Sequence, residues 1–247
     1  MDDSKLRSRV FTAPNGVQRK FSFRDGTNDE SCIIACFEED FYGICDRQFK
    51  EGEVVIDMGA HIGSVTMLML SVEPKLKVIS IEALPENANL VRLNTAQNGV
   101  ETVLYENLVF GKTDDVEKSI YYGDQSNESG RVHKFIGTII DNASEEIQDA
   151  RKHAVVKTIT VADIFKNENI DRCRYVKMDI EGAEKDIFTT IDKETLEKID
   201  EVCGEWHYGD YKELFNVTQG VFVDATTDPH NFDFINKDRV NEIKEDK

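Results

Sequence analysis

The 247-residue chain lacks the features that mark membrane and secreted proteins. No stretch approaches the roughly 20 apolar residues that a bilayer-spanning helix needs, and the first ten residues, MDDSKLRSRV, contain no apolar export segment. The five cysteines form no CxxC pair, and their odd number favours reduced thiols over a disulfide framework. We therefore expect a cytoplasmic protein with no membrane partner.

Positive charge is also scarce. The chain has 30 Lys and Arg residues against 48 Asp and Glu residues, which gives a formal net charge of -18. Nucleic acids and anionic membranes are bound by basic surfaces. The charge therefore argues against nucleic acid as a partner, and it leaves small substrates open.

The first 50 residues predict an N-terminal extension made of a hairpin and a helix. Residues 17–23 alternate weakly between polar and apolar side chains, as a strand does, and an Asp-Gly turn follows. Residues 32–44 carry apolar side chains at helical spacing, with Asn28 or Asp29 as the expected cap.

Residues 51–247 predict one α/β domain in which strands and helices alternate. VVID and VISIE are each followed by a helical pattern, which indicates parallel strands joined by crossover helices. TVLYENLV predicts a third strand, and RYVKMDI and EVCGEWH predict two more. GVFVDAT and FDFIN are close enough in sequence to pair antiparallel. We therefore predict a doubly wound, mostly parallel sheet with a reversed edge strand.

Residues from about 111 to 160 interrupt this pattern. They contain a Gly/Ser/Asn-rich stretch, GDQSNESG, and later an acidic helix-like segment, DNASEEIQDARKH. They have too few apolar residues for a core of their own, so we predict an elaborated insertion between strands. Loops on a rigid scaffold often build binding sites, and we expect this insertion to shape an acceptor pocket.

The segment VVIDMGAHIGS is the most informative, because an apolar strand runs there into a turn of small residues before a helix. Gly59 and Gly63 allow a ligand to approach the backbone closely. Glu82 ends the next strand, where doubly wound nucleotide sites keep an acid for ribose hydroxyls. Together these residues predict a nucleoside site.

Charge and spacing indicate which nucleoside. Asp57 ends the first strand, and its carboxylate would repel the diphosphate of a dinucleotide while attracting the sulfonium and ammonium groups of S-adenosylmethionine. The glycines also depart from the G-x-G-x-x-G spacing. We predict S-adenosylmethionine as the cofactor, with an NAD(P)-dependent oxidoreductase on a Rossmann-like sheet as the alternative.

Three segments in order resemble the motifs of the FkbM family of S-adenosylmethionine-dependent methyltransferases: VIDMGAHIGSVT, SIEALPENANLVRLNTAQNG and YVKMDIEGAEKDIF. VVKTITVADIF and GEWH resemble two further segments, so the likeness covers residues from about 50 to 210. It implies a Rossmann-like class I methyltransferase fold, with seven strands and an antiparallel last strand. It also implies methyl transfer, usually to an oxygen of a small molecule or sugar, so the expected partner is a small-molecule or glycan acceptor.

The resemblance also implies a set of cofactor contacts. Along the methionine end it places Asp57, Gly59, Ala60 and Gly63. Around the ribose and adenine it places Glu82, Ala83, Leu84 and Asn107. His61 stands where the family usually has Asn, so a cofactor contact and a simple helix-capping role both stay open for it.

Catalytic candidates should follow the strands on the cofactor side, because methyl transfer needs an aligned acceptor and, for a hydroxyl, removal of a proton. We predict that Asp179 faces the methyl group and that Glu181 orients the acceptor or accepts its proton. Glu184 fits that role or the start of a helix equally well. His207 is a candidate base, and Lys177 is expected to pair with an acid.

Two questions stay open at this stage. Asp179, Glu205 and His207 would suit a divalent metal, as in some O-methyltransferases, but such scattered ligands are a weak signal and we predict no metal. A non-catalytic nucleoside-binding module of the same fold is a further alternative, since fold does not guarantee activity.

Overall fold

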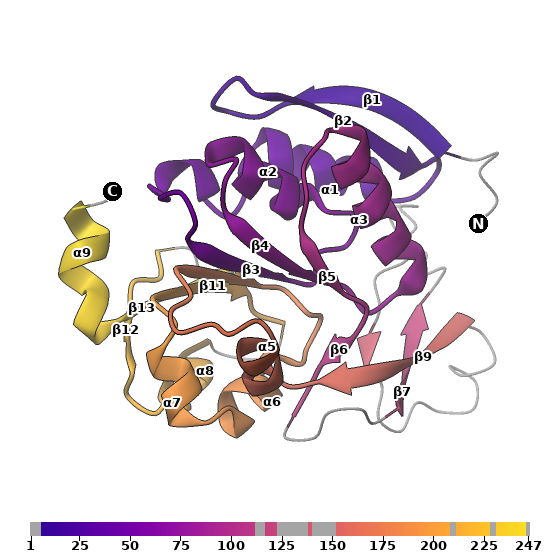
Figure 1. Ribbon diagram of the computed structural model, residues 1–247. Helices are drawn as coiled ribbons and strands as arrows, with labels where there is room; N and C mark the ends of the chain where they lie inside the picture. The colour runs from indigo at the N-terminus through magenta and orange to yellow at the C-terminus, as the bar shows by residue number, and fades with distance from the viewer. Residues whose placement is uncertain are drawn as a thin grey trace.

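The computed structural model describes residues 6–111, 117–122, 138–139, 152–207, 211–227 and 231–245. Its central sheet has seven strands in the order β12-β13-β11-β10-β3-β4-β5 (Figure 1). The strands are β3 (Val54–Met58), β4 (Lys77–Ile81), β5 (Val103–Tyr105), β10 (Tyr175–Met178), β11 (Glu201–Glu205), β12 (Phe222–Asp224) and β13 (Asn231–Asn236). The prediction of a doubly wound, mostly parallel sheet of seven strands is confirmed.

The reversed strand is not at the edge, where it was predicted. β13 runs antiparallel to both of its neighbours and lies between β11 and β12. Burial explains this order, because Phe232 and Phe234 of β13 are fully buried while β12 is partly exposed. The more apolar strand therefore occupies the interior position, and the less apolar one forms the edge.

Helices cover both faces of the sheet (Figure 1). On one face lie α1 (Asp29–Ile33), α2 (Ser64–Val72) and α3 (Pro85–Gln97), and on the other lie α5 (Val161–Asn167), α6 (Glu184–Thr190), α7 (Lys193–Glu197) and α8 (Tyr211–Asn216). Alternation along each strand supplies the two cores: Val55 packs on the first side and Ile56 on the second. The last helix, α9 (Val240–Glu245), follows the sheet. Among the described residues, no helix has both the length and the apolarity that crossing a bilayer requires.

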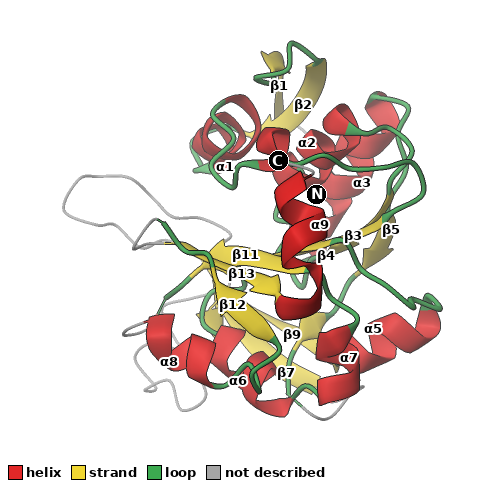
Figure 2. Cartoon of the chain, turned by 90° about the vertical axis from the view of Figure 1, so that its left-hand side faces the viewer, coloured by secondary structure: helices red, strands yellow, loops and turns green. Residues whose placement is uncertain are grey.

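The N-terminal segment forms the expected hairpin from β1 (Leu6–Thr12) and β2 (Gln18–Arg24), which lies over α2 and α3 (Figure 2). Its Phe11, Phe21 and Phe23 are buried in the same core as α2. The division of the chain into an extension and a domain stays a prediction, and the shared core shows how closely the two are packed.

The helix predicted over residues 32–44 is shorter than expected. After α1 the chain continues as a π-helix (Ile34–Glu38) and then turns, before a 3-10 turn at Ile44–Asp46. The carboxylate of Asp40 accepts hydrogen bonds from the backbone N–H groups of Ile44 and Cys45 at 2.6 and 2.7 Å. An aspartate that caps a turn in this way competes with helix continuation, which the apolar spacing alone did not reveal.

A second sheet of four strands, in the order β6-β9-β7-β8, contains three strands from the predicted insertion and one, β6, from the residues just before it. Its strands are β6 (Leu108–Val109), β7 (Glu117–Tyr122), β8 (Thr138–Ile139) and β9 (Lys152–Ile159). The run TVLYENLV, predicted as one strand, divides between the two sheets at residues 106 and 107. The GDQSNESG stretch lies outside the described residues, and so does all but the last two residues of the acidic helix-like segment.

Candidate cofactor and acceptor site

A cavity lies at the carboxyl ends of β3, β4 and β10, where a doubly wound sheet binds its ligands. Nine of the residues predicted from the sequence line it: Gly59, Ala60, His61, Glu82, Ala83, Leu84, Asn107, Asp179 and Glu181. Leu108, Val109 and Ile120 of the second sheet complete the wall. The part of the insertion that the structure describes thus contributes to the cavity. Asp57, Gly63 and His207 do not line it.

Backbone hydrogen bonds fix the turn after β3. Gly59 has a φ of +78°, and the N–H groups of Gly59 and Ala60 both donate to the carbonyl of Ile81, at 3.0 and 2.9 Å. The carboxylate of Glu82 accepts the N–H of His61 at 2.8 Å and that of Leu84 at 2.9 Å. Burial raises the pKa of Glu82, although these two N–H groups oppose the shift. Glu82 therefore positions the turn and also faces the cavity.

Asp57 occupies a different place from the one predicted. Its side chain is fully buried behind the turn, where it accepts hydrogen bonds from the backbone N–H and the hydroxyl of Thr66 at 2.9 and 2.7 Å. Its other oxygen lies 3.5 Å from Nζ of Lys177. The carboxylate thus anchors α2 and a buried lysine, and its influence on a bound ligand would act through the turn.

Lys177 has the acidic partners that the sequence predicted. Its ammonium group lies between Asp57 and Asp179, 3.7 Å from the latter, and donates to the carbonyl of Gly59 at 2.8 Å. This lysine therefore ties the turn after β3 to the end of β10.

His61 is held by a buried network from the N-terminal extension. Its Nε2 lies 3.3 Å from Oδ1 of Asp29, a fully buried carboxylate that also accepts two hydrogen bonds from the Arg24 guanidinium at 2.8 and 2.9 Å. Arg24 in turn donates to Asn87, and Asn87 donates to Glu82. Burial lowers the pKa of His61, but the adjacent Asp29 carboxylate outweighs it and raises that pKa to about 10. The imidazole is therefore positively charged at neutral pH.

We expect Asp29→Asn to reduce the dependence of stability on pH. The pKa of His61 is about 10 in the folded protein against an ordinary 6.5, so the charged histidine stabilises the fold fully below about pH 6.5 and loses that contribution as the pH rises through 10. Urea unfolding at about pH 6.5 and pH 9.5 should show a larger loss of stability for the wild type than for the variant. Asp25→Asn, at an exposed ion pair, is the control. Equal losses in wild type and Asp29→Asn would contradict the assignment.

Beside the end of the cavity that Asp179 and Glu181 line, carboxylates gather around one histidine. Asp179 accepts a hydrogen bond from the hydroxyl of Tyr42 at 2.8 Å, and Glu181 has a φ of +56°, which is unusual for a residue other than glycine. His207 makes a 3.0 Å hydrogen bond through Nδ1 with the buried Glu184, and its Nε2 lies 3.5 Å from Glu181. The three residues predicted to be catalytic, Asp179, Glu181 and His207, are thus neighbours.

This concentration of charge shifts two pKa values. Burial, with the charge of Asp179, raises the pKa of Glu181 to about 7. Burial lowers the pKa of His207, but the hydrogen bond with Glu184 and the surrounding carboxylates outweigh it and raise that pKa to about 9. Perturbed groups in a cavity are typical of functional sites.

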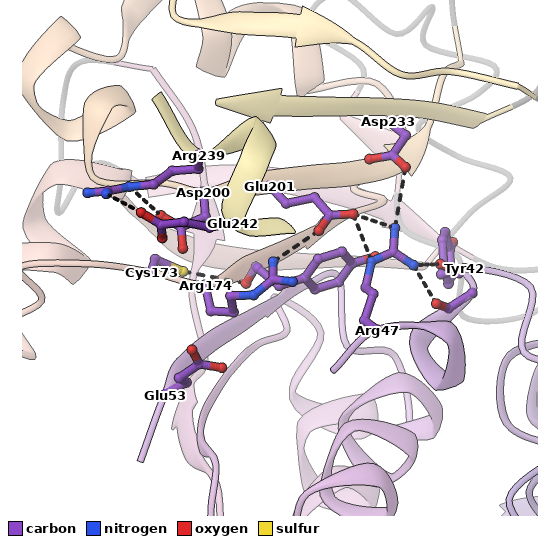
Figure 3. A network of polar contacts seen from close by, with 12 residues as sticks. Tyr42, Arg47, Glu53, Cys173, Arg174, Asp200, Glu201, Asp233, Arg239 and Glu242 are labelled. Carbon is purple, nitrogen blue, oxygen red and sulfur yellow. Dashed lines mark hydrogen bonds and ion pairs between the residues drawn. The ribbon is translucent and has the colours of Figure 1, made fainter. Parts of the chain in front are cut away.

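A buried ion-pair network holds Tyr42 in place (Figure 3). Arg47 donates to the carbonyl of Tyr42 at 2.7 Å and to Glu201 at 2.9 Å. The second carboxylate oxygen of Glu201 accepts a bond from Arg174 at 3.0 Å. All three charged side chains are almost completely buried. The loop that carries Tyr42 is therefore fixed to the centre of the sheet.

Sequence reasoning missed the residues that the extension and α3 bring to the site. Tyr42 is 137 positions from Asp179, and no local pattern links the two. Cys32 and Cys36 line the cavity, whereas the sequence showed only a pair of thiols one helical turn apart. Asn87 lies within the second motif, and its position five residues after Glu82 was the one available signal.

Comparisons with known proteins agree with this geometry. Residues 57–236 match the sequence profile of the methyltransferase FkbM domain. A protein of Beauveria bassiana named methyltransferase 1 is 22% identical over 171 residues, which cover 64% of this chain and 66% of that protein, just under two thirds of its length.

Two solved methyltransferase structures are similar to this chain at low sequence identity. One of them is a 16S rRNA methyltransferase of T. thermophilus in complex with AdoMet and guanosine. The superposition covers 95% of this chain and 51% of that protein's chain, with a TM-score of 0.50 and 10% identity. The alignment with the precorrin-6y C5,15-methyltransferase of Geobacter metallireducens covers 80% of this chain and 88% of that protein's chain, with a TM-score of 0.42 and 11% identity.

The profile match spans well over half of the chain and begins at Asp57, the penultimate residue of β3. Its extent confirms the resemblance found in the three motifs, and the methyl donor of this family is S-adenosylmethionine. The chain belongs to the FkbM family of methyltransferases, and S-adenosylmethionine is its cofactor.

Proposed function

We propose that this protein transfers a methyl group from S-adenosylmethionine to a hydroxyl group of a small molecule or sugar. One observation carries the proposal: a single cavity joins the glycine turn and Glu82 to Asp179 and Glu181. A nucleoside held by the turn would then lie next to a group of acids that can receive an acceptor and its proton.

In this proposal each part of the cavity has its own task. When bound, S-adenosylmethionine supplies an activated methyl group, so the chain has only to align the acceptor and remove a proton. Glu82 binds the ribose, with Ala83 and Leu84 beside it and Asn107 near the base. Asp179 faces the methyl group and Glu181 accepts the proton.

The net charge favours a small acceptor over a nucleic acid. A formal charge of -18 opposes binding of a phosphate backbone. The structural neighbour from T. thermophilus acts on rRNA by its name, but it shares only 10% identity with this chain. We likewise propose a cytoplasmic location, which agrees with five cysteines that are all free of disulfides.

We expect S-adenosylhomocysteine to raise the melting temperature and NAD to leave it unchanged, because a ligand that binds the folded state stabilises it increasingly as its concentration exceeds the dissociation constant.

Glu82→Gln should weaken S-adenosylhomocysteine binding by about tenfold in calorimetry, since an amide accepts fewer hydrogen bonds from ribose hydroxyls than a carboxylate does. Stabilisation by NAD, or full affinity in Glu82→Gln, would contradict this use of the cavity.

The acceptor can be found with a methyl-labelled cofactor. Incubation of the protein with metabolite extracts, followed by mass measurement of the labelled product, should give an O-methylated small molecule or glycan. Label in RNA, or on a nitrogen atom, would contradict the proposed acceptor class. Complete absence of transfer, with S-adenosylhomocysteine still bound, would favour the non-catalytic alternative.

A further inference from the structure

Three side chains at the ends of β10 and β11 direct ligand atoms toward one another. One oxygen or nitrogen atom from each of Asp179, Glu205 and His207 lies within 4.8 Å of the other two. Oδ1 of Asp179 and Nε2 of His207 are 3.7 Å apart, which is too long for a hydrogen bond. Two ligands bound at about 2.1 Å to one ion, roughly 120° apart, have this separation.

Residues outside the trio fix two of these side chains through their other polar atoms. Oδ2 of Asp179 accepts the Tyr42 hydroxyl and lies beside Lys177, which leaves Oδ1 directed at His207. His207 is bonded through Nδ1 to the buried Glu184, which leaves Nε2 directed at the trio. Histidines that bind metals are oriented in this way by a carboxylate on the other ring nitrogen.

Charge balance gives a second, independent indication of a cation. Among the described residues, the four carboxylates of Asp179, Glu181, Glu184 and Glu205 lie around two cationic side chains, Lys177 and His207. Within the part of the chain that the structure describes, Glu205 has no hydrogen bond or ion pair, and the fully buried Oε2 of Glu184 has no donor. A partly buried site with this excess of negative charge is stabilised by a bound cation.

We propose that Asp179, Glu205 and His207 bind one divalent cation beside the cavity, which Asp179 lines. Two carboxylates and one imidazole suit Mn²⁺ and related ions, and the partly exposed side keeps coordination positions open for a substrate oxygen. The role of the ion rests on the proposed function: it would bind the acceptor hydroxyl and lower its pKa, so that Glu181 can remove the proton. The expectation from the sequence that no metal is needed is replaced by this proposal.

The test uses the full chain and Mn²⁺ alone. Electron paramagnetic resonance and calorimetry should detect one saturable Mn²⁺ site per chain in the wild type. His207→Gln and Glu205→Gln should each weaken Mn²⁺ binding at least about tenfold, because a lost ligand or its orientation typically costs this much in affinity. Glu213→Gln, at an exposed ion pair on α8, is the matched control and should bind as the wild type does.

Several outcomes would overturn the proposal. They are the absence of a saturable site in the wild type, or equal Mn²⁺ affinity in the wild type and in both ligand variants. If a variant fails to fold, NMR of the wild type locates the ion instead. Paramagnetic Mn²⁺ bound by His207 should abolish the NMR signal of the His207 side chain, and an unaffected signal would refute the proposed site. S-adenosylhomocysteine binding in the presence of a chelator tests the cofactor site separately. Full methyl transfer in the chelator would refute the catalytic role of the ion.

Discussion

Glu201→Ala is expected to lower the free energy of unfolding by about 3–5 kcal/mol, because it removes the shared partner of two buried arginines. Arg47 and Arg174 each bond a different oxygen of this carboxylate, and both guanidinium groups are almost fully shielded from water. Without Glu201, the remaining ion pair of Arg47 in the described part of the chain is the longer one with Asp233, at 3.5 Å. Urea unfolding followed by circular dichroism measures the loss.

A second arginine–glutamate pair provides the control. Arg172 donates to Glu242 at 2.7 Å, but both side chains are about half exposed, so water screens their attraction. Glu242→Ala should leave stability nearly unchanged. Equal effects of Glu201→Ala and Glu242→Ala would show that burial adds nothing to the central pair.

Gly59→Ala is expected to reduce the affinity for S-adenosylhomocysteine by about 100-fold or more. A Cβ atom at this position would lie 1.8 Å from the backbone carbonyl oxygen of Asp179, and the backbone φ of +78° is itself strained for alanine. Strain of this kind costs about 1–3 kcal/mol, and the clash forces either the turn or the end of β10 to move. Both elements line the cavity, so calorimetry with S-adenosylhomocysteine reports the displacement.

Gly99→Ala separates the two contributions. Gly99 also has a positive φ, of +64°, but a Cβ there would meet no atom within 4 Å. This variant should lose about 1 kcal/mol of stability from backbone conformation alone and keep its ligand affinity. If Gly59→Ala binds S-adenosylhomocysteine as tightly as Gly99→Ala does, ligand binding does not depend on the close approach of the turn to the end of β10.

Local patterns predicted the sheet well, because each strand is a short apolar run that ends at a turn. The failures occurred where a polar side chain or a distant strand decided the outcome. Asp40 ends the π-helical segment by capping a turn, and Glu106 and Asn107 redirect a continuous apolar run into a second sheet. The interior position of β13 depends on how deeply Phe232 and Phe234 are buried, and the sequence does not state that depth.

In the candidate site, too, local patterns predicted the residues that follow strands and missed the contacts between distant positions. Gly59, Glu82 and Asp179 were predicted because each follows a strand, and the ends of neighbouring parallel strands meet. Asp57 was placed on the correct strand, but its side chain points away from the cavity because Thr66 and Lys177 bind it. Contacts of this kind join distant positions, so no spacing rule could have indicated them.

The N-terminal residues that contact the site lie outside the part of the chain that the family profile matches. The family profile starts at residue 57. Two residues before that point contact the site: Asp29 lies beside His61 in the turn, and Tyr42 donates a hydrogen bond to Asp179 after β10. A fragment cut at the profile boundary would retain the second and third motifs and all but the first two residues of the first motif, and it would lose both supports. The part of the chain that supports these two side chains therefore extends beyond the part that the family profile matches.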